Sequence, residues 1–337
     1  MKKINVLSLF DGMSCGQIAL DRMGIEVDQF FASEIDKYGI AVTQANFPNT
    51  KQIGDVTKVD SKDLPIIDLI IGGSPCQGFS FAGKQANFDD PRSALFFEFV
   101  RLYKELKERN PNIKFVLENV VMKQLYKDVI SEHLGVEPIL INSGLLSAQN
   151  RRRLYWTNIE GVEQPVDKGI IVGDILQNEV DEKYLITDKW KAWLDKHAPE
   201  RLKKKYMTVN PEKAITMTAR QYANWSGNFV TCVAQRGRYI VDGKRQDHKM
   251  KTKGLTTQRL EPRSDGKTNC LTTVQKDNYV TNWEDIRKLT PIECERLQTV
   301  PDDYTSVVSD TQRYKMLGNG WTVDVVCHIF ENLKKDL

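Results

Sequence analysis

Residues 4–16, Ile-Asn-Val-Leu-Ser-Leu-Phe-Asp-Gly-Met-Ser-Cys-Gly, decide the fold class. The run Ile4–Leu9 is apolar at most positions, which is typical of a strand that is covered on both faces of its sheet. Gly12 and Gly16 follow this run, and they allow a tight turn and a close backbone approach to a ligand at the carboxyl end of a sheet. Their spacing is not G-x-G-x-x-G, so it does not indicate a pyrophosphate site. The stretch predicts the first strand, turn and helix of an α/β ligand-binding fold.

The next residues, up to about residue 160, continue this alternation of strands and helices. Further β-rich apolar runs are Val27–Ser33, Ile66–Ile71 and Phe115–Leu117. Helical spacing of apolar residues occurs in Cys15–Met23, Ile40–Asn46 and Leu95–Glu108. This alternation predicts a parallel sheet with helices on both faces. Helical patterns return over Thr290–Thr299 and near Thr322–Leu333, so we expect the end of the chain to pack back on the first part.

The composition excludes several classes of protein. The chain has 337 residues, of which 40% are hydrophobic, enough for a sizeable core and against disorder. No apolar run approaches the roughly 20 residues of a membrane helix, and the basic N-terminus reaches Asp11 too soon for a signal peptide. The six cysteines form no Cys-x-x-Cys pair, so we expect neither a disulfide framework nor a metal cluster. These features predict a soluble protein of the reducing cytoplasm.

Positive charge is concentrated in one part of the chain. The net charge is only +3, but residues 201–276 contain 17 Lys and Arg against 5 Asp and Glu. From about residue 165, helical periodicity largely disappears, and a short Thr-containing motif recurs at 214–218, 254–258 and 270–275. We interpret this part as an irregular β-rich insertion that binds a polyanion. The predicted units are residues 1–164 with 284–337, and an inserted unit of residues 165–283.

Polar residues stand where the early strands are predicted to end. Glu34 lies 22 residues beyond Gly12, at the position where nucleotide-binding α/β folds hold ribose hydroxyls with a carboxylate. Asp55 could accept a hydrogen bond from an adenine amine. Cys76 follows Gly-Gly-Ser-Pro, neighbours that suit a site better than a core. The plainer interpretation is that these are surface carboxylates and a buried cysteine.

Two further groups of polar residues come later in the chain. Glu118 follows the run Phe115–Leu117, which predicts a carboxylate at the end of the neighbouring strand. Gln149, Arg151 and Arg153 would share one face of an extended segment. A solvated charge cluster is the plainer interpretation of these residues.

These blocks occur in the order found in the DNA (cytosine-5)-methyltransferase family, which the chain resembles. The blocks are Phe10–Gly16, Pro75–Gln77, Glu118–Val120, Gln149–Arg153, Arg287–Gln298 and Gly318–Gly320. Local strings such as 95–99, Leu-Phe-Phe-Glu-Phe, also look like the catalytic domains of animal de novo methyltransferases. The resemblance implies a Rossmann-like S-adenosylmethionine-dependent methyltransferase sheet with helices on both faces. It also implies that the basic insertion is a small β-rich target recognition domain.

The resemblance implies covalent catalysis at cytosine. Carbon 5 of cytosine is a weak nucleophile, and addition of a thiolate to carbon 6 raises the electron density at carbon 5. Cys76 is the expected nucleophile. Glu118 is expected to hold N3 and the exocyclic amine, Arg153 the O2 atom, and Arg151 to help position the loop and the ring.

The resemblance also implies S-adenosyl-L-methionine as the cofactor. The expected cofactor-binding residues are Phe10, Gly12, Ser14, Gly16, Glu34, Ile35, Asp55, Val56, Pro75, Leu95, Asn319 and Trp321. Among them Phe10 would stack on the adenine, Glu34 would bind the ribose and Asp55 the adenine amine. The last block departs from the common bacterial Gly-Asn-Ser-Val at Gly320 and Trp321.

The implied partner is double-stranded DNA, whose target base must leave the helix to reach a thiol. Residues 77–92 resemble the family's mobile loop, from which Gln77, Ser80 and Arg92 are expected to contact DNA. The basic insertion would neutralise phosphates. Its candidate base-reading residues are Arg220, Gln221, Arg236, Arg238, Gln258 and Arg259. We expect a monomer, with a cognate restriction endonuclease as a candidate partner.

Three alternatives remain open from the sequence. The chain could be a transfer-RNA cytosine-5 methyltransferase of the same family, although the long basic insertion favours duplex DNA. It could be a catalytically inactive DNA-binding relative, although it keeps Cys76, Glu118 and Arg153. A nicotinamide-dependent oxidoreductase would need a dinucleotide glycine pattern that this sequence lacks.

Overall fold

The computed structural model describes residues 3–75, 91–190 and 286–337 continuously. Between these ranges it describes residues 192–193, 196–197, 204, 207–219, 222, 227–231, 235–238, 240–241, 244–245 and 257–260. Only the backbone is described for 91–94, for 182 and for the described residues from 231 to 286.

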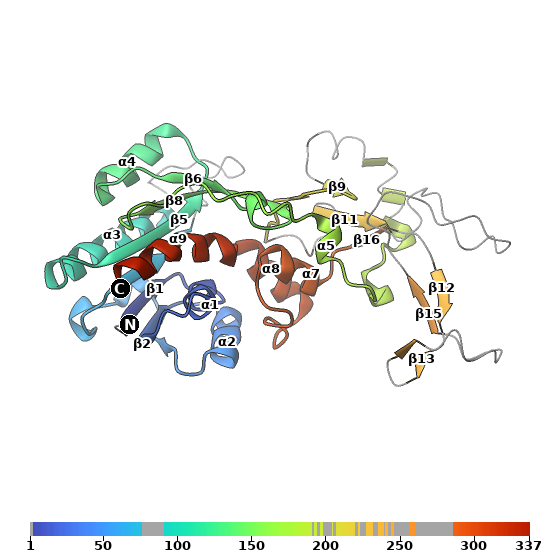
Figure 1. Ribbon diagram of the computed structural model, residues 1–337, viewed down its shortest axis with the longest axis horizontal. Helices are drawn as coiled ribbons and strands as arrows, with labels where there is room; N and C mark the ends of the chain where they lie inside the picture. Colours follow the sequence, from blue (N-terminus) through green and yellow to red (C-terminus); the bar gives the residue numbers. More distant parts are fainter. Residues whose placement is uncertain are drawn as a thin grey trace.

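The centre of the fold is a seven-stranded sheet in the order β3-β2-β1-β4-β5-β8-β6 (Figure 1). Its strands are β1 (Ile4–Leu9), β2 (Val27–Ser33), β3 (Lys51–Gln52), β4 (Leu69–Gly72), β5 (Lys114–Val120), β6 (Ile139–Asn142) and β8 (Arg152–Thr157). Strands β3, β2, β1, β4 and β5 pair in parallel, as predicted, whereas β8 is antiparallel to both β5 and β6. The predicted parallel sheet is thus confirmed for five strands, and the antiparallel edge is a feature that the prediction did not include.

Helices cover both faces of this sheet, as predicted. Ile4 and Val6 of β1 belong to one apolar cluster, while Leu7 and Leu9 of the same strand belong to a second cluster on the opposite face. The helices are α1 (Cys15–Arg22), α2 (Lys37–Asn46), α3 (Pro91–Arg109), α4 (Gln124–Leu134), α5 (Val172–Ile175), α7 (Pro291–Leu297), α8 (Asp310–Asn319) and α9 (Val323–Asp336). Helices α1 and α9 contribute to the first cluster, and α3 and α4 contribute to the second.

Between α5 and α7, most of the regular elements of the described backbone are short strands. A three-stranded sheet contains β9 (Met207–Val209), β11 (Gly227–Thr231) and β16 (Ile286–Lys288). Strand β10 (Ala214–Ile215) pairs in parallel with β7 (Gln149–Asn150), which lies in the first predicted unit, residues 1–164 with 284–337. Two antiparallel ribbons are β12 (Gln235–Arg238) with β15 (Thr257–Leu260), and β13 (Ile240–Val241) with β14 (Lys244–Arg245). The third copy of the Thr motif, 270–275, lies outside the described residues, and the unit boundaries remain a prediction.

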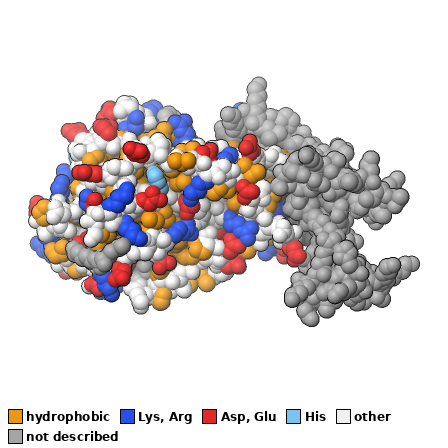
Figure 2. Space-filling model, viewed as in Figure 1, with side chains coloured by type: hydrophobic (Ala, Val, Ile, Leu, Met, Phe, Trp, Pro, Cys, Tyr) orange, Lys and Arg blue, Asp and Glu red, His pale blue; other side chains and the backbone are white. Residues whose placement is uncertain are grey.

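The described side chains on one face of the molecule carry charges of both signs. On the face shown in Figure 2, basic and acidic side chains are interspersed rather than gathered in a patch of one sign. Most side chains of the basic segment 201–276 lie outside the described ones. Within the described ranges, no helix has the length and apolar character needed to cross a membrane.

A buried ion pair joins β16 to α7, near the start of the C-terminal segment 284–337. Arg287 and Glu293 have side chains that are 1% and 0% exposed, and two hydrogen bonds of 2.7 Å join the guanidinium to the carboxylate. The carboxylate also accepts from the backbone N–H groups of Gln177 at 2.9 Å and Thr290 at 2.8 Å. These additional bonds offset the cost of removing the two charges from water.

Removal of one partner of this pair is expected to destabilise the fold strongly. In Arg287→Ala, Glu293 would stay buried without its counter-charge, so the free energy of unfolding should fall by about 3–5 kcal/mol. Urea denaturation measures this change. The matched control is Lys168→Ala, because Lys168 is 52% exposed in its ion pair with Asp324 and should contribute no more than about 1 kcal/mol. Equal losses in the two variants would contradict the expectation.

Candidate active site

The site begins at the turn that follows β1. Phe10 and Gly12 have positive φ angles of 58° and 60°, a conformation that bends the chain sharply away from the strand. Glu34, the residue after β2, stabilises this turn because its carboxylate accepts from the Gly12 N–H at 2.7 Å. The same carboxylate accepts from the N–H groups of Ile35 and Asp36, each at 2.7 Å. The turn and the end of β2 therefore form one rigid edge.

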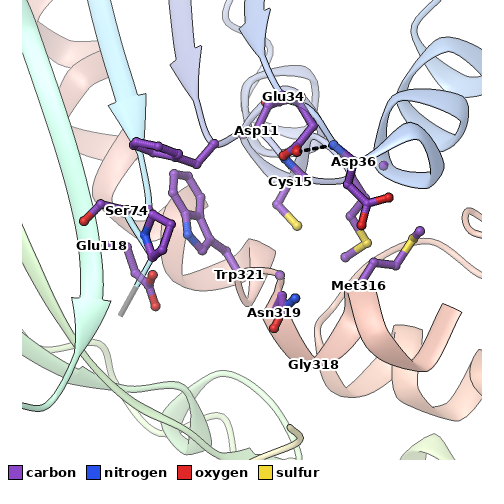
Figure 3. A pocket seen from close by; sticks show the side chains of 18 of the residues that line it. Asp11, Cys15, Glu34, Asp36, Ser74, Glu118, Met316, Gly318, Asn319 and Trp321 are labelled. Carbon is purple, nitrogen blue, oxygen red and sulfur yellow. Dashed lines mark hydrogen bonds between the residues drawn. The ribbon is translucent and has the colours of Figure 1, made fainter. Parts of the chain in front are cut away.

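A cavity of about 360 Å³ lies at this edge of the sheet (Figure 3). Its walls come from residues 8–13, 15 and 16, from residues 73–75 after β4, from the end of β5, and from α8 with the two residues that follow it. The predicted site residues that line it are Phe10, Gly12, Gly16, Glu34, Pro75, Glu118, Arg151, Arg153, Asn319 and Trp321. Segments from both ends of the sequence thus meet in one cavity.

Five of the predicted cofactor residues are described but do not line this cavity. They are Ser14, Ile35, Asp55, Val56 and Leu95. Ile35 is 77% exposed, directly after Glu34. The Asp55 carboxylate accepts from the N–H of Thr57 at 3.0 Å and from its hydroxyl at 2.9 Å, so it caps a single turn of 3₁₀ helix. Ser14 and Val56 are buried.

Glu118 lies within β5 rather than after it. The prediction was wrong because the antiparallel pairing with β8 extends β5 to Val120. The Glu118 carboxylate forms an ion pair with Arg153, with 2.9 Å between Oε1 and Nε, and their side chains are only 10% and 14% exposed. The pair is therefore largely shielded from water and screened much less than a surface pair.

The Trp321 indole lies between Glu118 and the Cys15 thiol (Figure 3). It approaches the end of β4 closely: a Cβ atom added to Gly73 would lie 2.9 Å from the indole nitrogen and 3.2 Å from Glu118 Oε2. A residue with a side chain at position 73 would push these groups apart, so glycine is needed here. In the view of Figure 3 the indole lies between the end of the cavity near Glu118 and the end near Asp11, and all three residues line the same cavity.

Arg151 turns away from the open part of the cavity and holds its wall. Its guanidinium is buried and donates to three backbone carbonyls, those of Met217 at 3.1 Å, Gly318 at 3.1 Å and Gly320 at 2.9 Å. Burial and the charge of Arg153 lower the pKa of Arg151 to about 10, so the group stays protonated at neutral pH. Its contacts are those of a residue that positions the wall.

Asp11 is a cavity residue that the sequence reasoning missed. Its side chain is partly exposed in the cavity, its Oδ1 accepts from the Ser8 hydroxyl at 2.5 Å, and its buried Oδ2 accepts no hydrogen bond within normal distance and angle limits from the described residues. Burial raises the pKa of Asp11 from 3.8 to about 6, although bonds from the hydroxyls of Ser8 and Ser14 partly oppose this rise. The sequence could have indicated this residue, because Asp11 lies two positions after the apolar strand β1, in the first turn of the fold.

A second missed feature is an ion pair at the rim of the cavity. Lys315 of α8 and Asp36, the N-cap of α2, are 2.9 Å apart, and both line the cavity. Burial alone would raise the pKa of Asp36, but the Lys315 ammonium and the N–H groups of Tyr38 and Gly39 lower it. Nothing in the local sequence relates two residues so far apart in the chain.

The remaining predicted residues are described by backbone only or not at all. Cys76, Gln77, Ser80, Arg220 and Gln221 lie outside the described residues, and only the backbone is given for Arg92, Arg236, Arg238, Gln258 and Arg259. Pro75, which precedes Cys76, lines the cavity. Arg236 and Arg259 are directly opposite each other in the β12–β15 ribbon.

Comparison with known proteins gives a consistent result over the whole chain. A family model described as C-5 cytosine-specific DNA methylase matches residues 4–335. The chain is 31% identical over 355 residues to the type II methyltransferase M.NlaX of Neisseria lactamica, covering 98% of this chain and 96% of the relative. It is 30% identical over 362 residues to M1.ScrFI of Lactococcus lactis subsp. cremoris, covering 98% and 78%.

Solved structures show the same fold. The structure of the Entamoeba histolytica methyltransferase EhMeth superposes with a TM-score of 0.69 at 17% identity, covering 100% of this chain and 99% of that one. At this identity the likeness concerns the fold alone.

The burial of Asp11 predicts a specific dependence of stability on pH. In the folded chain the carboxyl stays protonated up to about pH 6, whereas in the unfolded chain it ionises near pH 4. Its contribution should therefore make the free energy of unfolding fall between about pH 4 and pH 6, by about 3 kcal/mol in total. Asp11→Asn keeps an acceptor for Ser8 and cannot ionise, so it should be more stable than the parent protein at pH 7.

Urea denaturation between pH 4 and pH 8 measures this difference. Asp55→Asn is the matched control with the opposite sign, because the N–H and hydroxyl of Thr57 lower the pKa of the exposed Asp55. The stability that Asp55 contributes is present above its unfolded pKa, so its loss should appear at neutral pH. Parallel pH profiles for Asp11→Asn and the parent protein would show that Asp11 does not titrate as described.

Proposed function

The chain belongs to the C-5 cytosine-specific DNA methylase family, and on that premise we propose that it is a sequence-specific DNA cytosine-5 methyltransferase that uses S-adenosyl-L-methionine. The observation that carries this proposal is the single cavity at the carboxyl edge of the sheet. One end holds the shielded pair of Glu118 and Arg153, and the other holds the carboxylates of Asp11 and Glu34. The base and the methyl donor would meet directly within this one cavity, beside Trp321.

The end of the cavity near Asp11 fits S-adenosyl-L-methionine. This molecule carries an ammonium and a sulfonium but no phosphate, which agrees with an acidic cavity and with the turn after β1. Asp11 Oδ2 is buried without an ordinary hydrogen bond from the described residues, so a cation could replace the missing partner. Glu34 directly follows β2, where α/β folds hold ribose hydroxyls with a carboxylate. When bound, the cofactor supplies the methyl group.

The other expected cofactor residues would complete this end. Phe10, Gly12, Gly16, Pro75, Asn319 and Trp321 line the cavity. Ile35 offers an exposed apolar surface beside Glu34 for the adenine. We keep Ser14, Asp55, Val56 and Leu95 as residues around the cofactor, with Asp55 at the adenine amine.

The end of the cavity near Glu118 fits a cytosine that has left the DNA helix. The Glu118 carboxylate would accept from the exocyclic amine and the protonated N3, and Arg153 would donate to O2. Cys76 follows the cavity residue Pro75, and we propose that its thiolate adds to carbon 6. The electron pair of the double bond between carbons 5 and 6 would then be available at carbon 5. Carbon 5 would attack the methyl group of the cofactor, and S-adenosylhomocysteine would be left as the second product. Loss of the carbon 5 proton and elimination of the thiolate return the enzyme to its starting state.

Double-stranded DNA is the proposed substrate, held by the unit of residues 165–283. Arg236 and Arg259, which pair with each other in the backbone of one ribbon, would be two of the base-reading residues. Arg220, Gln221, Arg238 and Gln258 would read further bases, and Gln77, Ser80 and Arg92 would contact DNA near the extruded base. We propose a cytoplasmic monomer with, as in type II systems, a restriction endonuclease as its functional companion.

Methylation of DNA and of transfer RNA in parallel tests this substrate assignment. A plasmid expressed with the protein in a host without cytosine-5 methylation is expected to show methylated cytosines in one sequence context after bisulfite sequencing. Transfer of a labelled methyl group to transfer RNA, without transfer to DNA, would favour the RNA-directed alternative.

Glu118→Gln is expected to slow the chemical step without unfolding the protein. The amide cannot stabilise the positive charge that develops at N3, so single-turnover methylation should fall by roughly 10²- to 10⁴-fold. The variant should still unfold cooperatively, at a melting temperature lowered by the loss of the ion pair with Arg153. Glu132→Gln, an exposed substitution on α4, is the matched control and should keep the parent rate. A parent-like rate in Glu118→Gln would remove Glu118 from the mechanism.

A further inference from the structure

Residues 214–219, which we call the strap, lie against the cavity wall without lining the cavity. Strand β10 of the strap pairs in parallel with β7. Side chains add to this pairing, since the Met217 N–H donates to Gln149 Oε1 at 2.9 Å and the Thr216 hydroxyl donates to the Asn150 carbonyl at 2.7 Å. The strap belongs to the predicted recognition unit but is held by the first predicted unit.

Arg151 joins the strap directly to the wall of the cavity. One terminal nitrogen, Nη1, donates both to the Met217 carbonyl of the strap and to the Gly318 carbonyl of the wall, each at 3.1 Å. The other, Nη2, donates to the Gly320 carbonyl at 2.9 Å. The guanidinium is 3% exposed, so these charge-assisted bonds do not compete with bulk water.

Gly318 brings the two backbones into contact. A Cβ atom at this position would lie 2.3 Å from the carbonyl carbon and oxygen of Thr218 and 2.5 Å from the Ala219 nitrogen. These are backbone atoms, which cannot move aside as the end of a flexible side chain could. The strap therefore rests on the residue that precedes Asn319 and Trp321 of the cavity.

The strap also continues into the recognition unit. Asn228 of β11 accepts from the Ile215 N–H at 2.8 Å and donates to the Ile215 carbonyl at 3.1 Å, so it ties the strap to the three-stranded sheet. In the sequence, the strap immediately precedes Arg220 and Gln221, two of the expected base-reading residues. Hydrogen bonds therefore connect Asn228 of the recognition unit to the strap, and Arg151 connects the strap to the cavity wall. A movement of the recognition unit could reach the wall through these bonds.

We propose that Arg151 and Gly318 are positioning residues that couple the recognition unit to the cofactor cavity through the strap. The cofactor binds well only when the strap is docked, and cofactor binding in turn holds the strap in place. Such a coupling acts equally in both directions. The proposal rests on the proposed function, because it takes S-adenosylmethionine as the ligand of the cavity.

Hydrogen exchange of the full chain tests this coupling without DNA, with S-adenosylhomocysteine as the probe ligand. The ligand is expected to slow exchange in residues 10–16 and 316–321, which line the cavity, and also in the strap, which does not. In Arg151→Lys a single ammonium cannot reproduce the fork of bonds to three carbonyls. At saturating ligand, this variant should keep the protection of residues 10–16 and lose that of the strap.

Affinity for S-adenosylhomocysteine gives a second readout by calorimetry. Arg151→Lys is expected to bind about tenfold more weakly than the parent protein. Arg152→Lys is the matched control, since the neighbouring side chain is exposed, and it should bind as the parent does. Thr216→Val removes the hydrogen bond from the strap to the Asn150 carbonyl, and it should also bind S-adenosylhomocysteine more weakly. If thermal melting shows that Arg151→Lys does not fold, the affinity of Thr216→Val tests the proposal in its place.

The outcomes separate this proposal from the proposed function. If the parent protein binds no S-adenosylhomocysteine, the assignment of the cofactor fails. If the ligand protects residues 10–16 but leaves the strap unchanged in the parent protein, the coupling is wrong while the proposed function stands. Parent-like affinity in both Arg151→Lys and Thr216→Val would also overturn the coupling.

Discussion

The parallel register of β2, β1, β4 and β5 is the constraint on which the site depends. Leu9 pairs with both Ser33 and Gly72, and Gly72 pairs with Leu117. The next residue of each strand or turn, namely Phe10, Glu34, Gly73 and Glu118, therefore falls in one row at one edge of the sheet. If one of these strands shifted its register by one residue, the residue that follows it would point to the other face of the sheet. A larger shift would move that residue away from the cavity. The register thus brings the carboxylates of Glu34 and Glu118 to the same edge of the sheet, where both line the cavity.

The sheet edge alone does not close the cavity, and the C-terminal segment supplies the missing wall. Its return is stabilised by buried charge: Glu295, fully buried in α7, accepts from Arg313 of α8 at 3.0 Å and from the backbone N–H groups of Asp303 and Thr305. Helix α8 then leads into Asn319 and Trp321. The enclosed carboxyl of Asp11 costs stability at neutral pH, as expected where a group serves a ligand rather than the fold.

The sequence was sufficient for those features that are written locally. The apolar runs and helical patterns gave the strands β1, β2 and β4 and their helices, and the polar residues at their ends gave most of the cavity lining. The antiparallel β8 was not foreseen, because pairing direction depends on where the chain goes after Asn142. Asp11 was missed since burial of a carboxyl is a tertiary property. Arg151 was expected to position the loop and the ring, but its three carbonyl partners come from distant parts of the chain.

Covalent attack by Cys76 is the central claim, and trapping tests it most directly. Duplex DNA of mixed sequence with 5-fluorocytosine in place of cytosine is incubated with the protein and S-adenosylmethionine, and the products are digested and mapped by mass spectrometry. Fluorine cannot leave as the proton does, so the elimination step is blocked. The account predicts a stable protein–DNA adduct at Cys76 that is absent in Cys76→Ala. No adduct, or an adduct on another side chain, would contradict it.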